Sequence, residues 1–394
     1  SAAERFFEKC WSISETQLNI LMGYEYKELL VRLLADQGAE VLRVEQPPNE
    51  STGDPAADGG TGYVVQNRNK RSLTLNLAQP EGKTIFRKLV EQSDVLISNM
   101  RLSAATKLGA DYAAVRKLNP RLIYASITAY GPKGPYAGKA GYDRLTQGFS
   151  GAQYRRWENG TPVSTGIFLS DPSIPMLMGY GITLALLQRE KTGEGQLVEP
   201  SLLQAAIAMQ MTNLVKFDDA DEPVGDFDVP AYGIYCCSDD TFLNVTALRP
   251  QQFRRFCSLL DLDHVLDDPR AFDASRQREF KQDIHPIIEA IFLTKPSSEW
   301  LTLLDDADVP AAPVLERDQV FSEPQMVEND MFIRVMHPTA GPVQSFAPPF
   351  TLSGSDSVDH RAPPLLGEHS TEVLEELGYG LEDRPKIAFL QITS

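Results

Sequence analysis

The sequence predicts an α/β protein with a mainly parallel sheet. Short runs rich in β-branched residues alternate with amphipathic, helix-forming runs through residues 24–128. Strands and helices in alternation at this spacing are typical of right-handed βαβ units, whose ligands bind at the carboxyl ends of the strands. With 394 residues, of which 42% are hydrophobic, the chain is long enough for two domains.

The first half supplies most of the predicted sheet. Gly38 is expected to end the first helix, and Pro80 fits the first position of a later helix because its ring fixes a helical φ. Asn99, Met100 and Tyr130 lie at the carboxyl ends of predicted strands and therefore at the expected ligand edge. In chain order the predicted elements are helix 24–37, strand 41–45, strand 72–77, helix 80–92, strand 95–100, helix 112–118 and strand 122–128.

A second, smaller domain follows an acidic stretch rich in turn-forming residues, 217–230, which we interpret as a linker or an exposed loop. Beyond Val309, Pro-rich connections suggest a chain that returns across the first domain and ends in a helix with Ser370 as its N-cap. Between the acidic stretch and Val309, the predicted elements are strand 242–246 and helices 251–260, 279–292 and 299–304. The predicted domains are 1–216 (large), 225–325 (small) and 326–394 (completing the large domain).

Composition excludes several classes of partner. A formal net charge of −17 argues against nucleic acid or an anionic membrane. No run approaches the roughly 18 to 20 apolar residues that span a bilayer, and we expect a cytoplasmic protein. Neither the four cysteines nor the five histidines show metal-ligand spacing, so neither a metal nor a disulfide framework is expected.

The stretch 165–204 holds the candidate catalytic residue, Asp171, at a loop-to-helix junction. Pro172 is suited to the first helical position, and an apolar run reaches Leu187. Either Asp171 is an ordinary N-cap, or it is a nucleophile that the positive end of a helix keeps ionised. The features expected after the run are a wet helix end at Arg189, Glu190 and Lys191, a turn at Gly193 and Gly195, a short strand 196–199 and a capping box of Ser201 with Gln204.

A basic cluster precedes the second predicted strand. It consists of Arg68, Lys70 and Arg71, supplemented by Arg101 and Lys107. It is either an ordinary solvated turn or a phosphate site, since an acidic protein that binds a phosphorylated ligand needs positive charge concentrated locally.

Several motifs together resemble the class III CoA-transferases, the CaiB/BaiF family, and among them the formyl-CoA:oxalate branch. Asp171 precedes a helix that runs into REKTGEGQ and then SLL, as the nucleophilic aspartate does in that family. The other matching motifs are LLADQGAEVLRVEQP (33–47), NKRSLTLNLAQPEGK (69–83), DVLISNM (94–100), LNPRLIYASITAYGPKGPY (118–136), GYDRLTQGFSG (141–151) and LLGEHSTEVLEELGY (365–379).

The resemblance implies a Rossmann-like large domain built from both ends of the chain, a small domain, and a homodimer of interlocked subunits. It also implies transfer of CoA from an acyl-CoA donor to a carboxylic acid through an anhydride and then a CoA thioester on Asp171. CoA is then a substrate, and no resident cofactor is expected. Contacts to CoA implied by position fall on Leu75, Asn99, Met100, Lys107 and Tyr142.

Departures from the family pattern leave two alternatives open. Glu25 replaces an active-site glutamine, and 223–232 lack a glycine-rich loop, as in a CoA-binding homologue that has lost activity. Tyr142 stands where the related acyl-CoA racemases have a histidine, although a phenol with a pKa of about 10 is a poor base. If Glu25 lines the acceptor site, its charge predicts a monocarboxylate acceptor; otherwise it faces solvent at a helix start.

Overall fold

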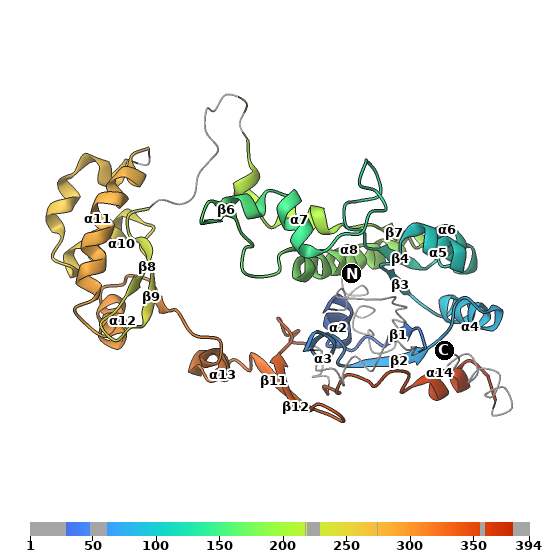
Figure 1. Ribbon diagram of the computed structural model, residues 1–394. Coiled ribbons are helices and arrows are strands. Elements are labelled where there is room, and N and C mark those ends of the chain that lie inside the picture. Colours follow the sequence, from blue (N-terminus) through green and yellow to red (C-terminus); the bar gives the residue numbers. More distant parts are fainter. Residues whose placement is uncertain are drawn as a thin grey trace. The chain divides into compact units, whose positions relative to one another are not determined.

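The computed structural model describes residues 29–47, 61–216, 218, 229–273, 275–354 and 359–380. The chain divides into two compact units (Figure 1). Unit 1 comprises Ser1–Met211 together with Asp330–Ser394, and unit 2 comprises Thr212–Asn329. Unit 1 is therefore assembled from segments far apart in the sequence.

Unit 1 is a mixed α/β structure with parallel strands, as the alternation of strands and helices predicts. β1 (Val41–Glu45) pairs in parallel with β2 (Lys70–Thr74), with Val41 opposite Lys70. β4 (Ile123–Ser126) lies between β3 (Val95–Ser98) and β7 (Leu197–Val198), and both pairings are parallel.

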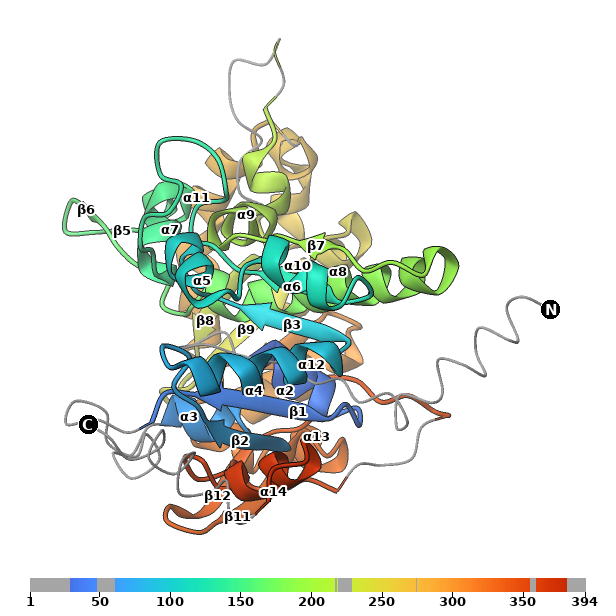
Figure 2. The same ribbon diagram turned by 90° about the vertical axis from the view of Figure 1, so that its right-hand side faces the viewer.

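Two apolar cores cover opposite faces of these strands, because successive side chains on a strand point to opposite faces. On β3, Val95 and Ile97 enter one core while Leu96 enters the other. The first core contains α2 (Leu29–Ala35), α8 (Ser170–Thr192) and α9 (Leu202–Ala208). The second contains α4 (Pro80–Glu91), which lies along β1 in Figure 2, α6 (Tyr112–Leu118) and α14 (Ser370–Glu376).

The helix ends follow local sequence in most places. Pro80 opens α4, Gly193 closes α8 in a left-handed conformation, and the Ser201 hydroxyl accepts the Gln204 backbone N–H at 3.1 Å. The N-cap prediction for Ser370 is wrong by one residue, since His369 takes that place. Ser370 instead accepts the Thr74 backbone N–H at 3.2 Å and so attaches α14 to β2. Within the described part of the chain, no helix is both long and apolar enough to cross a membrane.

The remaining elements of unit 1 are short. α3 (Thr61–Gln66) precedes β2, α5 (Leu102–Leu108) follows β3, and α7 (Asp143–Phe149) lies between β4 and α8. β5 (Trp157–Glu158) and β6 (Thr161–Pro162) form a small hairpin. The returning chain adds an antiparallel hairpin of β11 (Phe332–His337) and β12 (Gly341–Phe346).

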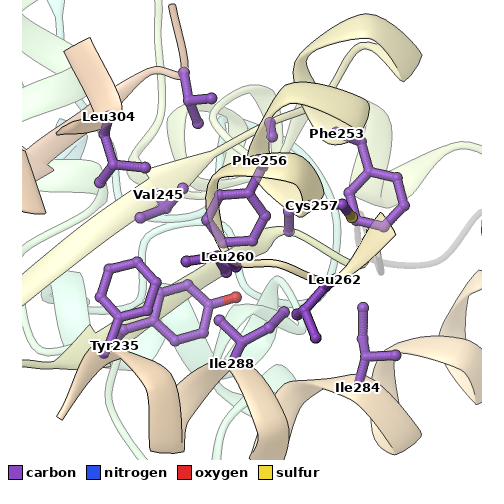
Figure 3. Packing of buried hydrophobic residues seen from close by; sticks show 14 of the residues in the cluster. Tyr235, Val245, Phe253, Phe256, Cys257, Leu260, Leu262, Ile284, Ile288 and Leu304 are labelled. Carbon is purple, nitrogen blue, oxygen red and sulfur yellow. The ribbon is translucent and has the colours of Figure 1, made fainter. Parts of the chain in front are cut away.

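Unit 2 packs helices on an antiparallel sheet with strand order β10-β9-β8. Its aromatic core includes Tyr235 stacked on Phe292 at 4.7 Å between ring centroids, and Phe292 stacked on Trp300 at 4.8 Å. Figure 3 shows Tyr235, Phe256 and Ile288 turned toward one another inside this core. The elements are β8 (Tyr232–Cys236), β9 (Phe242–Thr246), β10 (Ala311–Pro313), α10 (Pro250–Leu259), α11 (Gln277–Phe292), α12 (Ser297–Asp306) and α13 (Pro324–Glu328).

Candidate active site

Asp171 is the second residue of α8, and its side chain is half-buried. Leu169 occupies the N-cap position, so the interpretation of Asp171 as an ordinary N-cap is wrong. A residue in the first helical turn directs its own backbone N–H toward the start of the helix, where it needs an acceptor. That acceptor comes from a different helix.

Asp143, the first residue of α7, caps α8 from outside. Its Oδ1 accepts the backbone N–H of Leu169 at 2.8 Å, of Ser170 at 2.5 Å and of Asp171 at 3.2 Å. The same oxygen accepts the Ser170 hydroxyl at 2.8 Å. Asp143 is only 2% exposed, so these bonds form away from water, where charge-assisted hydrogen bonds are strong.

Gln147 lies one turn after Asp143 on α7 and attaches the loop before α8. Its Nε2 donates to Asp143 Oδ2 and, at 3.0 Å, to the Ile167 carbonyl. Its Oε1 accepts the Thr165 hydroxyl at 3.1 Å. Gln147 is 1% exposed, and its amide therefore joins α7, the loop and the cap of α8 in one buried network.

Two carboxylates thus meet the positive end of a 23-residue helix. The helix dipole and the backbone amides favour negative charge there. Asp143 takes the amides, whereas Asp171 is held on the first turn. A carboxylate held in this way is suited to act as a nucleophile toward an activated carbonyl carbon.

The residues expected to contact CoA all lie in unit 1. Leu75 follows β2 and is buried in the second core, while Asn99 and Met100 follow β3 and are half-buried. Lys107 is exposed on α5. Tyr142 is 60% exposed and directly precedes Asp143, so the α7 start brings it to the same end of α8 as Asp171.

Three members of the basic cluster are built into unit 1 instead of facing a ligand. Arg68 is 1% exposed and donates to both carboxylate oxygens of Asp36, at 2.8 and 2.6 Å. Lys70 is 2% exposed and donates to Asn67 at 2.9 Å. Their positions do not support the predicted phosphate contacts.

Arg71 pairs with the returning chain, at 2.8 Å from Glu376 and 3.2 Å from Glu372. Arg101 and Lys107 are exposed and retain the expected phosphate role as a prediction. Glu25 lies outside the described residues.

Arg189 corrects part of a further expectation, because Glu190 and Lys191 are exposed at the end of α8 as expected but Arg189 is buried. It is 5% exposed, and its Nη1 lies 2.8 Å from Asp94. The long-range partner, which helix periodicity does not reveal, explains why a charged residue is buried at the end of α8.

The family follows from the match of residues 28–370 to the family described as CoA-transferase family III. The chain belongs to CoA-transferase family III. Because the match covers most of the chain, the resemblance inferred from the motifs is confirmed, and the enzyme class is CoA-transferase.

Curated relatives of this CoA-transferase are similar over most of their length. The chain is 31% identical to succinyl-CoA:glutarate CoA-transferase of Homo sapiens, over 87% of this chain and 81% of that protein. It is 29% identical to formyl-CoA:oxalate CoA-transferase of Streptomyces avermitilis, over 89% and 92%.

Solved structures agree with the fold of the CoA-transferase. A CaiB/BaiF family protein from Brucella suis is 26% identical, with a TM-score of 0.78 over 91% of this chain and 98% of that chain. The Rv3272 protein of Mycobacterium tuberculosis has a TM-score of 0.79 at 24% identity, over 90% and 97%.

Sequence reasoning missed the roles of Asp143 and Gln147, although both lie within the motif GYDRLTQGFSG. Their spacing of four residues places them on one face of a helix. An acid and an amide on one helix face are the signal that could have indicated a shared structural partner. Identifying α8 as that partner required the tertiary structure.

Proposed function

We propose that the protein transfers CoA from an acyl-CoA donor to a carboxylic acid, with Asp171 as the covalent catalyst. The proposal rests on the different positions of two carboxylates at the start of α8. Asp143 accepts the backbone amides there, and Asp171 is held in the first turn.

In the proposed reaction an Asp171 carboxylate oxygen attacks the thioester carbonyl, and the C–S bond breaks to release CoA thiolate. The product is a mixed anhydride. The thiolate then attacks the Asp171 carbonyl carbon of the anhydride, which releases the donor acid and leaves an aspartyl-CoA thioester.

The second half of the reaction repeats these steps in reverse. The acceptor carboxylate attacks the aspartyl-CoA thioester and expels CoA thiolate. The product of this step is a mixed anhydride between Asp171 and the acceptor. The thiolate attacks the acceptor's carbonyl carbon, and Asp171 leaves as a carboxylate. No proton is gained or lost in the cycle, so the site needs no general acid or base of its own.

Exposed positive charge near the ends of β3 and α5 supports the placing of CoA. Arg101 and Lys107 are exposed there, and Asn99 and Met100 follow β3 directly. CoA carries a diphosphate and a 3′-phosphate, for which exposed cations are suitable partners. We assign Tyr142 to the thioester end of CoA, and its position directly before the Asp143 cap supports this assignment.

The acceptor belongs to the carboxylic acids, as in the relatives. Their names give glutarate, oxalate and phenyllactate as acceptors. The residues described around Asp171 do not distinguish among these acids, so the proposal extends to the class of acceptor and no further.

We also propose that the protein functions as a homodimer, with the outer face of α8 in the interface. Met176, Tyr180 and Leu184 are 56%, 67% and 46% exposed along one side of this helix. Large exposed apolar patches on a folded chain indicate a protein partner, and a second copy is the simplest one. Sedimentation that shows a folded monomer at micromolar concentration would contradict this.

Substitution of the nucleophile tests the proposed function. Asp171→Asn keeps the size of the side chain but cannot form the anhydride, so turnover should fall below about one hundredth of wild type. Binding of CoA should stay within a few-fold, since the amide leaves the fold intact. Turnover above that level would show that Asp171 is not the covalent catalyst.

A further inference from the structure

We propose that Asp143 is a positioning residue for Asp171 and that its negative charge keeps the Asp171 carboxylate reactive as a nucleophile. This inference rests on the proposed function, because it assigns a role relative to the Asp171 nucleophile. It concerns a residue that is only 2% exposed and that acts through Asp171.

Asp143 accepts backbone hydrogen bonds for which the Asp171 side chain would otherwise compete. A carboxylate that accepts several backbone N–H groups is stabilised as the anion, and it becomes a weaker nucleophile for that reason. At the start of α8, the amides of Leu169, Ser170 and Asp171 all donate to Asp143 Oδ1. Asp143 therefore removes these donors from competition for the Asp171 side chain.

The charge of Asp143 also acts on its neighbour. Asp143 is 2% exposed, so water screens its charge poorly, and its Oδ1 accepts the Asp171 backbone N–H at 3.2 Å, so this charge lies beside the residue that carries the nucleophile. A like charge near a carboxyl group disfavours its ionised form and makes its anion more basic. The positive end of α8 acts in the opposite direction, because it favours the anion.

Gln147 supports the position of the Asp143 cap without adding a charge. Gln147 bonds to Asp143 Oδ2, to the Ile167 carbonyl and to the Thr165 hydroxyl, and it carries no charge. Loss of Gln147 loosens the loop that leads to Asp171. It leaves the charge of Asp143 in place, so the two contributions can be measured independently.

The test is the dependence of kcat/KM on pH for the full-length protein with one acyl-CoA and one acceptor acid. Asp143→Asn retains an oxygen that accepts the three amides, but it removes the charge and replaces the acceptor of Gln147 Nε2 by an NH₂ group. Its plateau should fall at least about tenfold, and its acidic limb should move to lower pH by about one unit. Gln147→Ala should lower the plateau and leave the limb where it is in wild type.

The matched control is Asp111→Asn. Asp111 caps α6 by accepting the Ala114 backbone N–H at 3.1 Å, so the substitution makes the same chemical change at a helix start away from α8. Plateau and limb should both match wild type. A shifted limb in this control would show that loss of one acidic charge anywhere moves the profile, and the assignment to Asp143 would then be wrong.

If Asp143→Asn kept the acidic limb of the wild-type pH profile, the role given to the Asp143 charge would be wrong. If it also kept the plateau of kcat/KM, the positioning role would be wrong as well.

If Asp143→Asn does not fold, Asp143→Glu serves in its place, because it keeps the charge but displaces the cap. A lowered plateau with an unmoved limb is expected, and a moved limb would contradict the proposal. Asp171→Asn separates the two claims: if it is inactive while Asp143→Asn behaves as wild type, only the Asp143 inference fails.

Discussion

Arg68 and Asp36 form a buried ion pair, with Nη2 2.6 Å from Oδ2 and both side chains at most 1% exposed. Asp36 also accepts Arg32 at 3.3 Å, and the two arginines together reach the Phe346 carbonyl of the returning chain. One carboxylate therefore holds two cations and links α2, the start of β2 and β12. Burial lowers the pKa of Arg32 to about 10, as does the charge of Arg68 beside it.

We expect Asp36→Ala to lower the free energy of unfolding of unit 1 by about 3 to 5 kcal/mol, because it leaves two buried guanidinium groups without their carboxylate. Denaturant titration at fixed protein concentration measures this. Glu194→Ala is the control, since Glu194 pairs with Arg116 on the surface at 3.1 Å and should cost less than about 1 kcal/mol. Equal losses for the two variants would contradict the structural role given to Asp36.

The stability of unit 1 should decrease as the pH falls below 6.5. Burial, followed by the charge of Arg68, lowers the pKa of His360 from its ordinary value of 6.5, and Asp36 and Asp359 oppose this only in part. Below that value the unfolded chain binds a proton that the folded chain does not, so acid favours unfolding. Burial lowers the pKa of His369 in the same direction.

His360→Gln should therefore reduce the slope of stability against pH between about 5 and 6.5, measured by thermal unfolding in matched buffers. His264→Gln, which changes an exposed histidine of unit 2, is the control. A slope that both variants leave as in wild type would show that His360 does not carry this dependence.

Gly195 illustrates how a close backbone approach explains part of the REKTGEGQ motif. A Cβ built on Gly195 would lie 2.1 Å from the carbonyl oxygen of Leu122, the residue before β4. Gly193 has a φ of 76° and nothing within 4 Å of such a Cβ. Gly193→Ala should thus cost about 1 to 2 kcal/mol from backbone strain alone. Gly195→Ala should cost more, because the backbone around β7 must move, and thermal unfolding of the two variants gives the order.

Substitution of the exposed cations near β3 tests the placing of CoA. Arg101→Ala and Lys107→Ala should each raise KM for the acyl-CoA about tenfold, the loss expected for one charge-assisted hydrogen bond, with kcat little changed. Lys117→Ala removes an exposed charge on α6 and serves as the matched control. An unchanged KM in both test variants would place the CoA phosphates elsewhere.

Local sequence predicted the parallel α/β core well, because that core depends on short-range periodicity. Val41–Glu45 is a strand and Tyr112–Leu118 a helix at the predicted bounds. Asp171 was predicted as the nucleophile from its place at the start of a helical run and from the motifs around it. Partners far away in the sequence could not be predicted: Asp36 for Arg68, Asp94 for Arg189, and Asp143 for the start of α8.

The same limit explains the errors about charge. Arg68, Lys70 and Arg71 form a basic run in the sequence, and a run of that kind is either solvated or ligand-binding on local grounds. In the fold, Arg68 and Lys70 are buried, and Arg71 pairs with two glutamates of α14. Buried arginines are tolerated only where carboxylates neutralise them, and these carboxylates lie on other elements of unit 1.

Covalent trapping of Asp171 decides whether this residue is the nucleophile. The full-length protein is incubated with each of several acyl-CoAs in the presence of hydroxylamine, which attacks an aspartyl anhydride or thioester, and its peptides are then mapped by mass spectrometry. The account predicts a hydroxamate on Asp171 that requires both acyl-CoA and hydroxylamine and is absent from Asp171→Asn. An unmodified Asp171 with an acyl-CoA that supports turnover, or a hydroxamate on another carboxylate in its place, would contradict it.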